Sequence, residues 1–413
     1  MRQNSLMVQA SALIERLLLD LMRTPERVDG RMLIGLAQDE WDTLLALAER
    51  HRCAPYLAYV FARRTGLALP DRLQAIRARS ARRNLAVARD CIRIHAVLAG
   101  ANIEHRFLKG VPLAFRDYPH GWMRPMRDID VLVESSRLAE AYDLLLAAGG
   151  SIPAYADMPT EPLPEGKHLP PIRSPGGAMA VEVHYRLLLP TITLSSSALE
   201  AFEGEVWARK DSVTVGASNL PVPAPEALLG HLVVHGLLDH ELNNGPLFLT
   251  DLIHLLRSGR IDRTRWRDVV SRGELARAVQ VTAAMMPPAE AENLLAGLPA
   301  VTPLPDTTLL ALMLQPANQR NQVKLRASFV DGPPSSRVKL AWQKLIPRRA
   351  VLAARWRAET RRPDHPPRLA LLWLWYVGRK LVQYLRTPSG TDKRTLDELR
   401  ALRHALRDHA PDG

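Results

Sequence analysis

The sequence predicts an α+β protein in which a small mixed sheet is flanked by helical regions. Two observations support this. Apolar residues follow helical spacing through most of the first hundred residues and again after residue 224, whereas strand-like runs occupy 104–108, 128–133 and 179–185. A composition of 47% hydrophobic but only 5% aromatic residues is also typical of a helix-rich globular chain. With 413 residues the chain has room for two or three domains.

Residues 1–98 are predicted to form a helical N-terminal region. Trp41, Leu44 and Leu45 follow helical spacing, and a second helix starts near Pro55, a residue suited to a first turn. A longer helix over residues 71–98 is expected to end at Gly100, because glycine readily takes the left-handed conformation that closes a helix.

Residues 99–222 are predicted to form the sheet-containing core. A strand at 104–108 leads through Lys109-Gly110 into a short helix at 111–118. The run 128–133 starts polar and becomes apolar, as expected of a central strand. A helix at 136–148, a proline-rich loop at 151–178 and a strand at 179–185 follow.

Residues 223–300 are predicted to be helices that pack on this core, and 301–413 a basic helical region. The last region holds 21 Lys and Arg against 9 Asp and Glu, which accounts for the whole net charge of +12. Clustered cationic side chains attract RNA, anionic lipid or an acidic partner, although a solvated basic surface gives the same pattern. Trp373, Trp375 and Tyr376 lie among these basic residues and fit either a buried helix face, base stacking or a membrane interface.

Several protein classes are excluded by the same composition. Cys53 and Cys91 are too few for a disulfide framework or a four-cysteine zinc site, so we expect two buried, reduced thiols. The N-terminal segment lacks a secretion signal, and the longest apolar run, 369–378, is about half of the ~20 residues that span a bilayer. A cytoplasmic protein is therefore expected.

Asp128-Ile129-Asp130 is the most informative motif. Residues two apart on a strand share one face, so these carboxylates are predicted to lie close together, where a cation would relieve their repulsion. Glu182, on a later strand, is the natural third carboxylate. Hard cations such as Mg²⁺ take oxygen ligands together with phosphate oxygens, which indicates phosphoryl or nucleotidyl chemistry. The alternative is a pair of acidic residues that face water at a strand end.

Lys109 and Gly110 form a turn that leads into a helix about twenty residues before this motif. Backbone N–H groups at a helix start can hold a phosphate, and Lys109 is one of only three lysines before residue 301 in an arginine-rich chain. A compact ammonium that reaches a phosphate would explain this choice. A surface lysine is the alternative.

Histidines supply further candidates. His184 follows Glu182 by two residues on the same strand face, and His168 lies in the proline-rich loop; either could orient an acceptor or act as general base, unless both are structural. His231 and His235 share a helix face farther along, with His240, Asp251 and His254 nearby. No third ligand stands at a zinc-site spacing, so packing or substrate contact is expected for them, and Asp251 should stabilise the helix junction.

Three stretches together resemble the uncharacterised nucleotidyltransferase-like family of the DNA polymerase beta superfamily. They are FLKGVPLAFRDYPHGWMRPMRDIDVLV, then KHLPP, then VEVHYRL; EWDTLLALAERHRCAPYL upstream and FLTDLIHLL downstream add to the likeness, which covers roughly residues 35–290. The resemblance implies a small mixed nucleotidyltransferase-type sheet. It also implies that Asp128, Asp130 and Glu182 are catalytic and bind two divalent ions, Mg²⁺ or Mn²⁺.

The resemblance further implies an NTP substrate, with ATP as the default, and transfer of its nucleoside monophosphate to a hydroxyl. The superfamily usually has Gly-Ser where this chain has Lys109-Gly110, a departure typical of this family. Lys109, Gly110, Arg124 and Arg127 are therefore the candidates for phosphate binding, with an ion pair to a neighbouring aspartate as the alternative for Arg127.

The sequence thus predicts a metal-dependent nucleotidyltransferase whose acceptor is a small molecule, peptide, protein or RNA. The alternative is a non-catalytic module that binds RNA or a partner protein within a biosynthetic complex, since fold does not fix function. An enzyme that modifies RNA ends, held by the basic C-terminal region, would combine both. Three intact carboxylates favour the enzyme.

Overall fold

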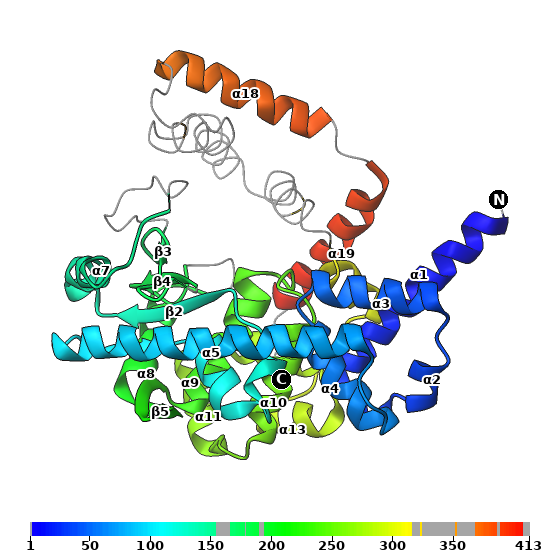
Figure 1. Cartoon of the computed structure of the whole chain (residues 1–413), viewed down its shortest axis with the longest axis horizontal. Helices are drawn as coiled ribbons and strands as arrows, with labels where there is room; N and C mark the ends of the chain where they lie inside the picture. Colours follow the sequence, from blue (N-terminus) through cyan, green and yellow to red (C-terminus); the bar gives the residue numbers. More distant parts are fainter. Residues whose placement is uncertain are drawn as a thin grey trace.

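The computed structural model describes residues 2–153, 166–177, 179–189, 194–315, 323, 352, 368–385 and 389–407. Within them the chain is mostly helical and contains one four-stranded and one two-stranded sheet (Figure 1). The predicted α+β class is confirmed. Residues 154–165 and 178 of the proline-rich loop and much of the basic C-terminal region lie outside the described residues.

Helices form the N-terminal part of the chain, as predicted. They are α1 (Arg2–Arg23), α2 (Gly30–Ile34), α3 (Gln38–Arg50), α4 (Ala54–Thr65) and α5 (Asp71–Gly100). Pro55 occupies the first turn of α4, where its missing N–H costs nothing, and Gly66 closes that helix with a φ of 68°. In Figure 1 the long helix α5 runs from the N-terminal helices to the region under the sheet.

The main sheet has the strand order β1-β2-β4-β3, where β1 is His105–Phe107, β2 Asp128–Val133, β3 Ile172–Arg173 and β4 Ala180–His184. The two central strands are parallel, and each edge strand is antiparallel to its neighbour. The chain crosses from β2 to β4 through α7 (Leu138–Ala147), which contacts β4. The register places Asp130 opposite Glu182 and Leu132 opposite His184.

Two features of the core differ from the sequence prediction. The short helix expected after Lys109 is a single turn, α6 (Gly110–Pro112), continued by a π-helical turn at Leu113–Asp117. A hairpin of β5 (Lys210–Val215) and β6 (Ser218–Pro223), preceded by α8 (Ser196–Ala208), was not predicted.

The helices after the hairpin all contribute to one apolar cluster except α18, which packs with Leu352 in a small cluster of its own. They are α9 (Pro225–Val233), α10 (Leu247–Arg257), α11 (Arg263–Arg272), α12 (Ala276–Ala283), α13 (Pro288–Leu295), α14 (Asp306–Met313), α18 (Leu369–Leu385) and α19 (Ser389–Arg407). A second π-helical turn, Val234–Asp239, follows α9 directly.

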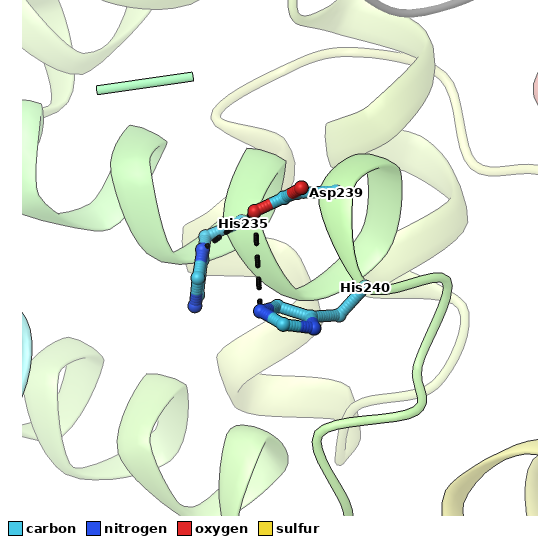
Figure 2. A group of neighbouring side chains, drawn as sticks. All are labelled: His235, Asp239 and His240. Carbon is cyan, nitrogen blue, oxygen red and sulfur yellow. Dashed lines mark ion pairs between the residues drawn. The ribbon is translucent and has the colours of Figure 1, made fainter. Parts of the chain in front are cut away.

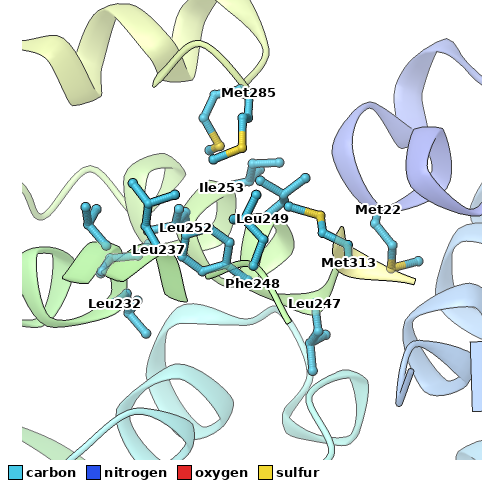
Figure 3. Close-up of a cluster of buried hydrophobic side chains, with 14 of the residues drawn as sticks. Met22, Leu232, Leu237, Leu247, Phe248, Leu249, Leu252, Ile253, Met285 and Met313 are labelled. Atoms are coloured by element: carbon cyan, nitrogen blue, oxygen red, sulfur yellow. The ribbon is translucent and has the colours of Figure 1, made fainter. Parts of the chain in front are cut away.

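Two large clusters of buried apolar side chains hold the sheet and the helices other than α18 together. The larger one joins the N-terminal helices to the helices after residue 224, and Figure 3 shows Met22 of α1, Leu249 of α10 and Met313 of α14 within it. The smaller one lies around the sheet and includes Phe107, Val131 and Val183. Burial of this apolar surface is the main force that holds the sheet against α5 and α7.

Candidate active site

Three carboxylates lie on one face of the two central strands. Asp128 and Asp130 are two residues apart on β2, so their side chains point to the same side of the sheet. Glu182 of β4 lies opposite Asp130 in the parallel register. Asp130 is buried, whereas Asp128 and Glu182 are half-buried. The fold therefore brings together all three acidic residues that the sequence singled out.

His184 lies against two of these carboxylates. Its Nε2 donates to Asp130 Oδ1 at 2.9 Å and lies 3.4 Å from Glu182 Oε2, while Nδ1 lies 3.3 Å from the carbonyl oxygen of Arg186. Burial alone would lower the pKa of His184, but its contacts with Asp130 and Glu182 outweigh burial and raise it. Because both ring nitrogens face acceptor oxygens, the imidazolium is the form that fits this position.

His168 lies on the solvent side of the same group. A bridge pairs it with His184, and its Nε2 is 3.7 Å from Glu182 Oε2. Its Nδ1 donates to the carbonyl oxygen of Leu169 at 2.8 Å, and burial lowers its pKa. His168 is therefore a neutral imidazole whose Nε2 is able to accept a proton, whereas His184 is a proton-bearing partner of the carboxylates.

Lys109 reaches Asp130 from the turn between β1 and α6. Its Nζ donates to Asp130 Oδ1 at 2.7 Å, the same oxygen that His184 contacts. The backbone of Lys109 has φ 48° and ψ −105°, a region that residues other than glycine rarely occupy and that often marks a functional site. The next residue, Gly110, has no side chain, and a Cβ at this position would lie only 2.9 Å from Met126 Cγ.

The charges of the three carboxylates are unequally compensated. Burial alone would raise the pKa of Asp130, but Lys109 and His184 outweigh it and hold that pKa well below its usual range. Burial raises the pKa of Asp128 to about 6, and repulsion from Asp130 and Glu182 adds to the shift. Asp128 is therefore the carboxylate whose negative charge is least compensated by neighbouring cationic side chains. An added cation would neutralise this charge.

The donor atoms of this group fit a divalent metal. One oxygen each of Asp130 and Glu182 and a ring nitrogen of His184 lie within 4.8 Å of one another, and Asp128 adds carboxylate oxygens on the same face. As a proton donor, His184 positions these carboxylates and is not itself a ligand. A set rich in carboxylates suits a hard cation such as Mg²⁺ or Mn²⁺.

The structure gives Arg124 a different environment from the one expected of a free phosphate ligand. Its guanidinium forms a bidentate pair with Asp251 of α10, with Nε to Oδ1 at 3.0 Å and Nη2 to Oδ2 at 2.8 Å. Tyr118 donates its hydroxyl to Asp251 Oδ1 at 2.7 Å. Asp251 thus anchors the loop before β2 on the helical body. Nη1 of Arg124 donates to the carbonyl oxygen of Pro125 at 3.0 Å and lies beside Gly110.

Arg127 and a residue that sequence reasoning missed complete a cationic group beside Asp128. Arg127 is exposed, and Arg52 is half-buried in the turn between α3 and α4, where it has a φ of 64°. Burial, together with the charges of Arg124 and Arg127, lowers the pKa of Arg52 to about 10, while Asp128 opposes this shift. Arg52 was missed because its approach to β2 is a tertiary contact that no local pattern reveals.

The remaining histidine candidates separate into two places. His254 of α10 stacks on Tyr118 with ring centroids 4.2 Å apart and belongs to the packing around Asp251. His231 is fully buried, and His235 packs against it and lies near Asp239 and His240 (Figure 2). Asp239 is a third potential ligand that the sequence reasoning did not consider.

Comparison with known proteins shows the family of this chain. A family model described as an uncharacterised nucleotidyltransferase matches residues 37–287. The chain belongs to this family. The matched segment of the uncharacterised nucleotidyltransferase runs from α3 through α12 and contains every candidate site residue, whereas 301–413 lie outside it. No curated protein and no solved structure matched the chain.

Family membership supports nucleotidyl transfer as the general chemistry of this protein. It also implies a nucleotide substrate. The described helices include none with the length and apolar character that crossing a membrane requires.

Proposed function

We propose that this protein is a metal-dependent nucleotidyltransferase that moves a nucleoside monophosphate from an NTP, by default ATP, to a hydroxyl group of an acceptor. The observation that carries the proposal is the convergence of Asp128, Asp130 and Glu182 on one sheet face, with the pKa of Asp128 raised by burial and by its two neighbours. Such a cluster is costly unless cations bind there, and perturbed carboxylates of this kind concentrate at functional sites.

Asp128, Asp130 and Glu182 would hold two divalent ions. Bound there, they would supply positive charge for the attacking and leaving oxygens of an in-line displacement. In the reaction the acceptor oxygen forms a bond to the α-phosphorus, the bond to the pyrophosphate oxygen breaks, and the hydroxyl proton leaves.

The side chains around the carboxylates suit the other needs of this reaction. Lys109 and His184 fix Asp130 from two sides, which orients its carboxylate. Arg52 and Arg127 place positive charge beside Asp128, where a triphosphate would approach, whereas the guanidinium of Arg124 is paired with Asp251. His168, neutral and half-buried, is the better placed imidazole to take the acceptor proton.

The test is transfer of label from each NTP, labelled at the α-phosphate, to small molecules, protein and RNA of a cell extract, with Mg²⁺ or Mn²⁺. The Asp128→Asn/Asp130→Asn variant is compared with wild type and with Asp143→Asn, an exposed carboxylate on α7. We expect a labelled product with wild type and Asp143→Asn but not with the double variant. The product would name both the nucleotide and the acceptor class.

The opposite outcome favours the non-catalytic alternative. Absence of metal-dependent transfer, with RNA or a protein retained equally by wild type and the double variant, would identify a binding module. RNA retention that falls steeply as salt rises would indicate phosphate contacts by basic residues.

A further inference from the structure

A second group of potential metal ligands lies outside the carboxylate cluster. His235, Asp239 and His240 lie in and directly after the π-helical turn that follows α9 (Figure 2). His235 Nδ1 is 3.2 Å and His240 Nε2 is 3.9 Å from the same atom, Asp239 Oδ2. All three side chains are partly accessible, with exposed fractions of 15% for His235, 27% for Asp239 and 41% for His240.

The π-helical turn is what brings the two imidazoles together. On an α-helix, residues five apart point about 140° away from each other, since each residue turns the helix by about 100°. In this turn the N–H of His240 instead bonds to the carbonyl oxygen of His235 at 3.0 Å. The rings then lie with centroids 4.3 Å apart. Local π-helical turns of this kind are frequently found at functional sites.

These distances match those between ligands of one metal ion. Zinc binds imidazole nitrogen and carboxylate oxygen at roughly 2.0–2.2 Å, so two tetrahedral ligands lie about 3.4 Å apart. The two contacts to Asp239 Oδ2 lie on either side of that value. His235 Nδ1 is buried within the site and faces Asp239 Oδ2 at 3.2 Å. A bound cation would replace the proton between these two atoms and bind both of them.

The same oxygen already receives a cationic group from elsewhere in the chain. Lys167 Nζ donates to Asp239 Oδ2 at 2.5 Å. The backbone of Lys167 is fixed beside β4, because its carbonyl oxygen accepts from the N–H groups of Tyr185 and Arg186. An ammonium therefore occupies the position toward which both imidazoles converge, and it would compete with a metal ion for Asp239.

We propose that His235, Asp239 and His240 bind a divalent transition metal of the Zn²⁺ class, which displaces the ammonium of Lys167 from Asp239. Two imidazoles and one carboxylate suit zinc, cobalt and iron in preference to Mg²⁺, which takes oxygen ligands. The site is therefore separate in both its residues and its metal preference from the carboxylate cluster on the sheet.

The test is titration of the metal-freed full-length protein with Co²⁺, followed by visible absorption, and then displacement by Zn²⁺. We expect one Co²⁺ per chain to show the intense absorption of a low-coordinate site, whatever Co²⁺ the sheet carboxylates bind, and this absorption to be lost when Zn²⁺ is added. Asp239→Asn and His240→Gln are expected to weaken Co²⁺ binding at least about tenfold, because each removes a direct ligand.

Lys167→Met is the variant that separates this proposal from simple loss of structure. Removing the competing ammonium is expected to tighten Co²⁺ binding several-fold, a gain that misfolding does not produce. His120→Gln, an exposed histidine stacked on Trp122, is the matched control and should leave affinity unchanged. Asp128→Asn/Asp130→Asn should retain the Co²⁺ signal, which distinguishes this site from the proposed catalytic one.

Three results would overturn the proposal. One is a wild-type protein that gives no such Co²⁺ spectrum. Another is equal Co²⁺ affinity of wild type, Asp239→Asn and His240→Gln, which would place the metal elsewhere. The third is affinity unchanged or weakened in Lys167→Met, which would contradict the proposed competition for Asp239.

Discussion

Asp130 Oδ1 accepts from two cationic side chains, Lys109 at 2.7 Å and His184 at 2.9 Å. Of the three acidic residues only Asp130 is buried, and its low pKa depends on these contacts because burial by itself favours the neutral acid. Lys109 therefore has a role that the sequence did not suggest. It keeps a buried carboxylate charged, in addition to any contact with a phosphate.

Replacing Lys109 by methionine should lower the rate of nucleotidyl transfer about 100-fold, the typical cost of removing one preorganised electrostatic contact. The physical reason is that Asp130 would lose its ammonium and bind a proton more readily. The rate should therefore recover partly as pH rises. The measurement is kcat against pH with the acceptor found in the extract.

Lys210→Met is the control for this experiment, since Lys210 is an exposed lysine on β5. Its rate should equal that of wild type at every pH. A Lys109→Met enzyme with the wild-type rate would show that Asp130 does not need the ammonium.

At the scale of single elements, strand β1 contains a buried histidine that responds to pH. His105 Nδ1 donates to the carbonyl oxygen of Ile103 at 2.8 Å, and Nε2 lies 3.0 Å from His95 Nδ1. Burial lowers the pKa of His105 from 6.5 to about 4. The folded protein therefore favours the neutral ring, whereas the unfolded chain takes up a proton near the ordinary pKa.

The free energy of unfolding should consequently fall as pH is lowered from about 6.5 to about 4, because the unfolded chain then binds more protons. The contribution of His105 is fully present above pH 6.5 and amounts to roughly 3 kcal/mol, at 1.36 kcal/mol per pKa unit. Urea unfolding at pH 7.5 and pH 5 measures about 2 kcal/mol of this contribution, the part lost between pH 6.5 and pH 5. In His105→Asn the difference between the two pH values should shrink.

His120→Asn provides the comparison for His105, because His120 is exposed. It should keep the wild-type dependence on pH. If His105→Asn kept it as well, another buried group, such as His254, whose pKa burial also lowers to about 4, would be responsible.

At the scale of the whole molecule, the C-terminal helix α19 is part of the helical body and not a free basic arm. Leu399, Leu402 and Leu406 are buried in the larger apolar cluster. Arg403 Nε pairs with Glu241 Oε1 at 2.7 Å, and Thr308 of α14 donates to Glu398 at 2.5 Å. Part of the basic region 301–413, which the sequence predicted as a surface for RNA or an acidic partner, therefore packs against the helical body.

Leu402→Ala should lower the free energy of unfolding by about 2–5 kcal/mol, since Leu402 is fully buried and the change leaves a cavity. Leu374→Ala on α18 is the matched control, because Leu374 is 59% exposed. Urea unfolding curves of both variants test the difference. Equal midpoints would show that α19 does not stabilise the body.

The sequence predicted the helical regions, both central strands and the group of three carboxylates with its histidines. It succeeded there because strand periodicity places Asp128 with Asp130 and Glu182 with His184 by local geometry alone. Their roles in catalysis and metal binding stay predictions. The predicted boundaries between regions at residues 98, 222 and 300 also stay predictions.

The features that were missed have different physical reasons. The two-residue strand β3 is too short for a periodic signal. The β5–β6 hairpin does have a periodic signal that was overlooked. Buried apolar residues alternate with more exposed ones on either side of the turn at Gly216, at Val213, Val215, Leu220 and Val222. Arg52 depends on tertiary packing. Asp239 follows His235 by four residues, a spacing that the sequence does show, whereas His240 joins them only through the π-helical turn.

Helix α5 contributes to both apolar clusters. Leu73 and Ile76 belong to the larger one, whereas Val87, Cys91 and Ile94 belong to the cluster around the sheet. A fragment that begins at residue 99 would keep the three carboxylates but lose α5. The apolar side chains of the sheet that pack against α5 would then be exposed to water. The smallest portable version of this catalytic unit therefore has to start near Asp71, and any transplant of the site into another protein has to carry this helix with it.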